Sequence, residues 1–301
     1  MKKNIVINSL LIILMIVFIV FSFEVALKYK TKINDEENSF KNLIQDCQKN
    51  MNSSNDISYK NYCKSIIDDP LYKPDFFSVF SNVLIFDMQF LNFFVVLIIF
   101  LLVSRNVCYF LKYGYIENSI TRESYKSSIS KIMKSAYKNI WIIPIIGLII
   151  IIPIALNFTF DCSYAVYYGK SIWPKSIMKV PIVFILLYEF NLLLHSILYT
   201  NISLIVSRKQ HNYIIAFILS ILFFLGLELF LEIFSGMFFN YIFGVSIGSL
   251  FNIVNLFRFN TDYGIFPLFA FILTFSVVSS LIVYILYRNP EKLINDCEKN
   301  N

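Results

Sequence analysis

The residues best suited to chemistry in this sequence are ionisable side chains that interrupt long apolar stretches. Glu228 and Glu232 are four residues apart, so a helix would place both carboxyl groups on one face. A charge at the centre of a membrane costs at least about 2.5–3.5 kcal/mol on insertion scales, so such residues need a reason to be there. They could form an ion relay, pack against polar partners or line a vestibule. The candidates for such a pathway or vestibule are Glu189, His195, Glu228 and Glu232.

Sequence patterns that carry catalysis or bind cofactors are absent. There is no G-x-x-x-x-G-K-[ST] loop for phosphates, no H-E-x-x-H zinc motif and no G-x-S-x-G nucleophile elbow. His195 has no second His or Cys nearby at the spacing of metal ligands, so it does not predict a metal site. We therefore expect this chain to be no enzyme and to hold no cofactor or metal. Any work driven by ATP would require hydrolysis on another subunit.

Long apolar stretches must position these side chains. Hydrophobic residues make up 57% of the sequence and charged residues only 15%, which excludes an ordinary soluble domain. Each stretch reaches the roughly 20 residues that cross about 30 Å of hydrocarbon as a helix. We predict an all-α polytopic membrane protein, a single transmembrane domain over residues 1–301. Its six spanning helices are expected at Ile5–Leu27, Val83–Val103, Ile140–Phe160, Val180–Val206, Ile214–Phe234 and Ile265–Tyr287.

Lysine and arginine residues near the ends of these stretches predict the orientation. Positive residues beside a span favour the cytoplasmic side, and they are frequent after the second and the last stretch. We expect both termini in the cytoplasm and the chain in the plasma membrane, with the first stretch kept as a signal anchor. The same bias accounts for the net charge of +6, and no basic stripe with interleaved aromatic residues occurs. Nucleic acid is therefore not an expected partner.

The interval at residues 28–81 is polar and, in this topology, external. Apolar residues recur at helical spacing in two short runs, Phe40–Cys47 and Tyr59–Ile67, which predict two amphipathic helices. Pro70 and Pro74 should break any helix before the second span begins. The interval is thus predicted to be a small helical cap.

Two cysteines lie within this predicted cap. A disulfide between Cys47 and Cys63 would staple the loop if the compartment is oxidising. Two unpaired thiols in a helical cap fit the sequence equally well, so both possibilities stay open here.

The interval at residues 104–139 is basic and amphipathic. From Tyr125 to Tyr137, apolar residues recur at three- and four-residue steps, and lysines occupy mostly the other face. Thr121 is the expected N-cap, with Glu123 in the first turn, where a carboxylate meets the positive end of the helix. The pattern predicts a helical elbow and then an amphipathic helix that leads into the third span. A helix lying on anionic lipid headgroups fits the same pattern.

These features together resemble a known family. The long first external loop, the run Lys112-Tyr-Gly-Tyr-Ile-Glu-Asn-Ser-Ile-Thr-Arg-Glu-Ser-Tyr-Lys126 and an apolar, glycine-bearing segment before the last span are similar to membrane subunits of ATP-binding cassette (ABC) exporters, of the type 2 permease class of low-GC bacteria. The resemblance implies that the elbow is a coupling helix that docks on a cytoplasmic ATPase subunit. The coupling residues it implies are Glu117, Asn118, Thr121, Arg122 and Tyr125.

The segment at residues 235–259 is apolar but interrupted by glycines and asparagines. It is too broken for a clean span and too apolar for an ordinary loop. Gly244 and Gly248 form a GxxxG pattern, which lets helices approach closely. Related exporters place short re-entrant helices at this point, so the resemblance implies a re-entrant external segment.

The resemblance also implies a transport function that this chain does not power itself. It predicts a permease subunit in the lipid bilayer, working as a homodimer or with a second permease and with cytoplasmic ABC ATPases. The cargo classes it implies are lipids, peptides, antimicrobial compounds and glycans. Two alternatives stay open: an ion-coupled secondary transporter that uses the intramembrane acids, and a membrane sensor or immunity protein without transport.

Overall fold

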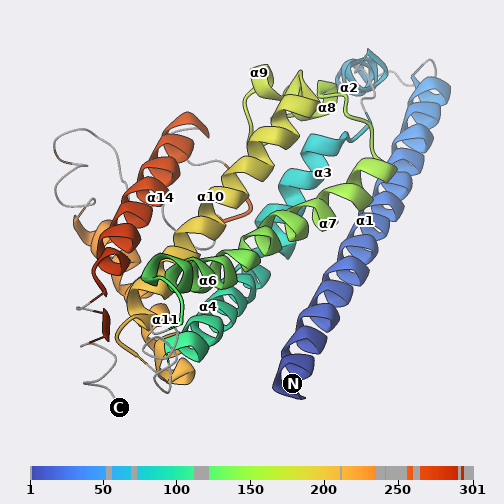
Figure 1. Ribbon diagram of the computed structural model, residues 1–301. Helices are drawn as coiled ribbons and strands as arrows, with labels where there is room; N and C mark the ends of the chain where they lie inside the picture. The colour runs from blue at the N-terminus through green and yellow to red at the C-terminus, as the bar shows by residue number, and fades with distance from the viewer. Residues whose placement is uncertain are drawn as a thin grey trace. The chain divides into compact units, whose positions relative to one another are not determined.

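The computed structural model of the protein is all-helical over the residues it describes (Figure 1), which are 2–51, 56–68, 73–111, 122–210, 212–234, 241, 256–259, 265–290 and 293–294. Within these described ranges, six helical segments are long and apolar enough to cross a membrane, as predicted. They are α1 (Lys2–Asn50), α4 (Gln89–Leu111), α6 (Tyr125–Tyr137) continued by η2 (Lys138–Trp141) and α7 (Ile142–Asn157), α10 (Pro181–Ser207), α11 (Tyr213–Phe234) and α14 (Ile265–Arg288). The chain is therefore a multi-pass membrane protein.

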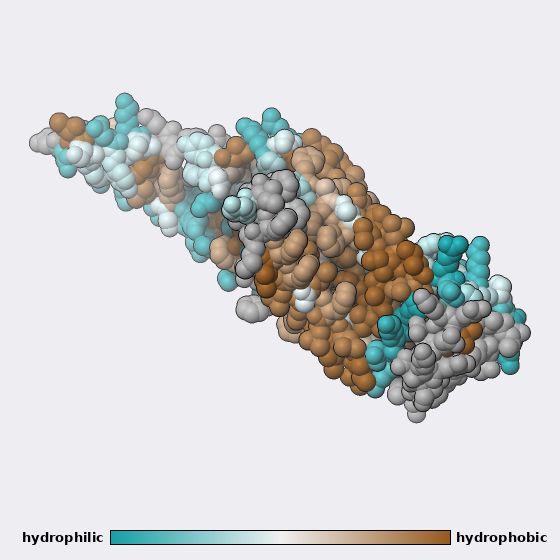
Figure 2. Space-filling view, turned by 90° about the vertical axis from the view of Figure 1, so that its left-hand side faces the viewer, coloured by the Kyte–Doolittle hydropathy of each residue, from teal (hydrophilic) through white to brown (hydrophobic). Residues whose placement is uncertain are grey.

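Large apolar side chains on the outside of these helices agree with a lipid environment. Leu222, Phe230 and Ile285 are each more than half exposed, and each belongs to a candidate spanning helix. Hydrophobic side chains gather over a wide area of the face seen in Figure 2. Helices suit such an environment because they satisfy their backbone hydrogen bonds internally.

The chain divides into two compact units, and it passes between them at the start of η1, within α7 and at the start of α10. The first unit comprises Met1–Val83 and Ile149–Pro181, and the second comprises Leu84–Leu148 and Ile182–Asn301. The first unit holds α1 and the short helices α2 (Ile57–Asp68), α3 (Phe76–Asn82), α8 (Ser163–Tyr167) and α9 (Lys175–Met178). The second holds α4, α6, α10, α11 and α14, and a π-helical turn, η1 (Val83–Asp87), lies at the boundary.

The helix α1 is one continuous element of 49 residues. The separate short helix predicted at Phe40–Cys47 is wrong, because these residues form the last turns of α1. Positions 28–50 contain neither Gly nor Pro, so nothing in the sequence stops the helix that the apolar stretch begins. The second helix predicted in the cap is present as α2.

A buried aspartate organises the first unit. Asp75 caps α3 by accepting a hydrogen bond at Oδ1 from the backbone N–H of Ser78, over 2.8 Å. Its other carboxylate oxygen accepts from the backbone N–H of Ala165 in α8, over 2.9 Å. One carboxylate thus satisfies backbone donors at the starts of two helices, which otherwise lack intrahelical partners. Next to Asp75 in the sequence, the ring of Phe76 packs against the ring of Phe160, with their centroids 4.4 Å apart.

The second unit is built around α4, which packs against α11 and α6. Phe100 of α4, Tyr199 of α10 and Phe224 of α11 form a ring cluster with centroids 5.3–6.0 Å apart. Beside it, the hydroxyl groups of Ser104 and Ser203 share a hydrogen bond of 2.9 Å between α4 and α10. Aromatic packing and small polar contacts of this kind are typical of helix association in membranes.

Candidate functional site

The candidate coupling site begins where the chain turns into α6. Ser124 is the N-cap: its backbone is extended and its hydroxyl oxygen accepts from the N–H of Ser127. The prediction that Glu123 lies in the first helical turn is wrong, since α6 begins only at Tyr125. Thr121, the cap predicted for that turn, lies outside the described residues. Both Ser and Thr are good caps, and the extended backbone at Ser124 sets the start of the helix.

Glu123 lies beside the first turns of α6. Its carboxylate accepts hydrogen bonds from Lys131 Nζ, at 2.5 Å and 2.6 Å, and from Ser127 Oγ at 3.0 Å. The lysine, more than the serine, lowers the pKa of Glu123. Because both partners are exposed, the ion pair contributes little to global stability. The effect of the ion pair is local, because it joins a residue before α6 to the helix. The neighbouring Arg122 is exposed.

The apolar face of α6 is covered by protein. Ser128, Ile132 and Ala136 are fully buried, and the helix packs against α4. Asn106 of α4 donates a hydrogen bond to the backbone oxygen of Ser135, over 3.2 Å. Burial of the stripe in the second unit therefore explains the amphipathic pattern without lipid headgroups.

Hydrogen bonds attach the first turn of α6 to two spanning helices. The Tyr125 hydroxyl donates to the backbone oxygen of Tyr287 in α14, over 2.7 Å. The Tyr287 hydroxyl in turn donates to the backbone oxygen of Leu204 in α10, over 3.0 Å. Tyr287 is 3% exposed, so its hydroxyl bond to Leu204 is buried, whereas the bond from Tyr125 is part-buried. The two tyrosines therefore link α6, α14 and α10 in series.

The last turn of α6 is attached to the same two helices. The Tyr137 hydroxyl donates to Asn201 Oδ1 of α10, over 2.5 Å. The Asn201 amide nitrogen lies 2.9 Å from both Ser279 Oγ and Ser280 Oγ of α14 and donates to them. Asn201 is fully buried, and its side chain joins α6 to α14.

The segments predicted to be cytoplasmic come together at one end of the second unit. Tyr125 and Tyr287 join the start of α6 to the end of α14. Cys108 near the end of α4 donates to the backbone oxygen of Gln210, just after α10, over 3.1 Å. This clustering brings the C-terminal ends of α4, α10 and α14 to one end of the second unit, and the cytoplasmic orientation itself stays a prediction.

The four ionisable residues inside the spans have different surroundings. Glu189 is half-buried, neither of its carboxyl oxygens accepts a hydrogen bond from the residues that the structure describes, and one lies 2.9 Å from where a Cβ on Gly147 would stand. The Nδ1 atom of His195 lies 2.9 Å from the backbone oxygen of Asn191 in its own helix. Glu228 is half-buried, whereas Glu232 is exposed. Over the described part of the chain, no three His, Cys, Asp or Glu residues are grouped so that they could hold a metal ion.

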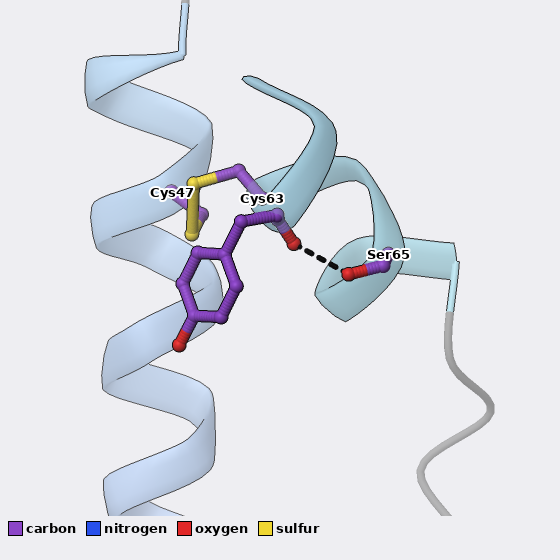
Figure 3. Close-up of a disulfide and its surroundings, with 4 residues drawn as sticks. Cys47, Cys63 and Ser65 are labelled. Atoms are coloured by element: carbon purple, nitrogen blue, oxygen red, sulfur yellow. Dashed lines mark hydrogen bonds between the residues drawn. A yellow bond between two sulfur atoms is a disulfide. The ribbon is translucent and has the colours of Figure 1, made fainter. Parts of the chain in front are cut away.

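The two cysteines of the cap form a disulfide (Figure 3), with their Cα atoms 5.2 Å apart. Cys47 is near the end of α1 and Cys63 is within α2, and both are buried. In α2, Ser65 Oγ donates a hydrogen bond to the backbone oxygen of Tyr62 over 2.7 Å. The disulfide is the covalent link between α1 and α2. Disulfides persist in oxidising compartments, so the bond fits an external position for this cap.

Several predicted residues lie outside the part of the chain that the structure describes. They include Glu117, Asn118 and Thr121 of the elbow and most of residues 235–259, so the re-entrant segment stays a prediction. Sequence reasoning missed Tyr137, Asn201 and Tyr287. The signal for Asn201 was its strongly polar side chain inside an apolar stretch, where a partner on another helix is expected.

Comparisons with known proteins give no family for this chain. No family model matches the sequence, and searches of curated proteins and of solved structures find no match. Function is therefore argued from the residues and their geometry.

Proposed function

We propose that this chain is the membrane permease subunit of an ABC exporter and that a separate cytoplasmic ATPase powers it. The attachment of α6 carries the proposal. Tyr125 and Tyr137 tie its two ends to α14 and α10 through hydrogen bonds. A displacement of the elbow before α6 would therefore reach two spanning helices through protein contacts.

The elbow supplies the surface on which the ATPase docks. Arg122 is exposed directly before α6, and the resemblance adds Glu117, Asn118 and Thr121. The permease works as a homodimer or with a second permease, both termini lie in the cytoplasm, and the complex resides in the plasma membrane. Its cargo is a lipid, a peptide, an antimicrobial compound or a glycan.

A secondary transporter is the second candidate, because of Glu189. A carboxyl group in a spanning helix with no hydrogen-bond partner among the described residues can take up and release a proton when its surroundings change. This alternative predicts transport by the isolated chain under an ion gradient. It also predicts that Glu189→Gln abolishes this gradient-driven transport, whether or not an ATPase is bound to the chain.

Charge reversal at the elbow tests the proposal. The chain is purified from native membranes and bound partners are identified by mass spectrometry, with Arg122→Glu and Glu117→Lys compared with the wild type. A like charge in a docking contact costs several kcal/mol, so we expect the variants to reach the membrane in normal amount but to lose the ATPase. Lys170→Glu, an exposed reversal after α8, is the matched control and should retain it.

A second variant separates docking from transmission. Tyr125→Phe removes one hydroxyl and leaves the elbow charges intact, so the ATPase should remain bound while transport per ATP hydrolysed falls. Wild-type partner retention and transport in both charge-reversal variants would refute the coupling role.

A further inference from the structure

A pocket of about 230 Å³ lies in the first unit, whereas Arg122 and Tyr125, the described residues proposed for coupling, belong to the second. Its first wall is the outer part of α1, which contributes Ile33, Glu36, Glu37 and Phe40. These positions follow the i, i+3, i+4, i+7 spacing of a single helix face. The opposite wall includes Lys73, Tyr164 and Tyr168, which are not part of α1.

Contacts within the unit hold the two walls together. Lys73 Nζ lies 3.4 Å from Glu37 Oε1 and so forms an ion pair across the pocket. The segment with Lys73 leads into Asp75, whose carboxylate accepts from the backbone of Ala165 in α8. Because Tyr164 is in this same short helix, one buried carboxylate joins the segment that contains Lys73 to the helix that carries the tyrosine.

The two glutamates of the pocket differ in how well they are neutralised. Glu37 has two cationic neighbours, since Lys41 Nζ is 2.7 Å and Lys73 Nζ 3.4 Å from its Oε1. Among the residues that the structure describes, Glu36 pairs with Lys32 alone, at 3.9 Å, and both side chains of that pair are more than 60% exposed. Such a pair contributes almost nothing, so the charge of Glu36 remains available at the pocket.

Aromatic rings stand opposite this charge. The rings of Tyr164 and Tyr168 have centroids 4.7 Å apart, and burial, followed by the charge of Glu36, raises the pKa of Tyr164. A carboxylate facing two tyrosine rings attracts a cation from both sides, because ring faces carry negative potential. Lys73 also lines the pocket, but its charge is paired with Glu37, whereas an anion would meet the charge of Glu36.

We propose that this pocket binds an alkylated ammonium group. Its charge lies between the Glu36 carboxylate and the two tyrosine rings, and its methyl groups contact Phe40. Drug-sized ligands occupy roughly 300–1,000 Å³, so a pocket of about 230 Å³ suits a headgroup. The site lies outside the coupling residues, and it does not depend on the proposed transport function.

Choline is the probe, and 3,3-dimethylbutan-1-ol, which has the same shape without the charge, is its control. The full-length protein is placed in nanodiscs of phosphatidylglycerol, which has no ammonium headgroup, and binding is measured by calorimetry. We expect saturable choline binding and at least about tenfold weaker binding of the alcohol. Adding phosphatidylcholine distinguishes the sources, since it competes only if the site accepts a headgroup that belongs to a lipid.

Two variants decide the role of the charge. Glu36→Gln should weaken choline binding at least about tenfold, whereas Asp35→Asn, at the neighbouring exposed position that does not line this pocket, should leave it unchanged. ATPase retention should be normal in both, so failure here is distinguishable from failure of the coupling proposal. Equal binding of choline and the alcohol, or an equal loss in the two variants, overturns the assignment.

Discussion

Removing the disulfide between α1 and α2 has an effect that follows directly from the geometry. Cys47 and Cys63 are 16 positions apart, and the chain-entropy treatment assigns about 3 kcal/mol to a closed loop of this length. Packing leaves large side chains of α2 uncovered, since Ile57 is 75% and Tyr62 53% exposed. In a variant with both cysteines changed to serine, α2 should therefore detach on the order of 100-fold more often.

Amide hydrogen exchange of the full-length protein in nanodiscs measures this directly. The amides of α2, Ile57–Asp68, should lose protection in Cys47→Ser/Cys63→Ser, and the same loss should follow when the wild type is reduced. Amides of α3 should keep their protection, because Asp75 caps that helix independently. Cys162→Ser is the matched control, since Cys162 is a free cysteine of the same unit. If α2 keeps its protection in the double variant, or loses it equally in Cys162→Ser, the reasoning fails.

Three further predictions concern packing, orientation and pH. Gly147→Ala should lower the free energy of unfolding of the second unit by about 1–3 kcal/mol, because the added Cβ would crowd side chains of α10. Gly226→Ala is the control and should leave this free energy unchanged, because that position faces open space. Equal melting temperatures of the two variants would contradict this prediction. In a cysteine-free background, an impermeant thiol reagent should label Lys170→Cys in intact cells but Lys126→Cys only after permeabilisation, and the opposite result would reverse the orientation. Hydrogen bonds from two lysines lower the pKa of Glu37, so its ion pairs should stabilise the cap above pH 4.5 and be lost as the pH falls through the lowered pKa. Glu37→Gln should therefore reduce the pH dependence of amide exchange protection in α1 between pH 5 and 3. An unchanged pH dependence in the variant would exclude this role.

The spanning helices could be predicted because length and composition suffice for them. A run such as Ile265–Tyr287 has one stable form in lipid, and the structure has a helix at Ile265–Arg288. The full length of α1 was not predicted, because the continuous apolar stretch ends near Leu27. The signal for it was the lack of Gly and Pro at positions 28–50, which allows a polar stretch to continue a helix.

The candidate site was only partly predictable, because its contacts join segments far apart in the sequence. Tyr125 was identified, but its partner Tyr287 is 162 positions away, and one sequence cannot show which helices pair. The same holds for Asn201, whose partners in α6 and α14 lie 64 to 79 positions away. In the pocket of the first unit, only Phe40 had been placed on a helix by sequence, as part of a separate short helix, and the wall opposite α1 requires the fold.

The unbroken course of α1 has a mechanical consequence. At 1.5 Å per residue, the part beyond Leu27 is a stiff rod about 35 Å long, joined without a hinge to the segment in the bilayer. A tilt of about 10° where the helix leaves the membrane would swing its far end, with Cys47 and the attached α2, by about 6 Å. Spanning helices adjust their tilt when the bilayer thins or thickens. The position of the cap should therefore depend on the thickness of the surrounding membrane, amplified by the length of the rod.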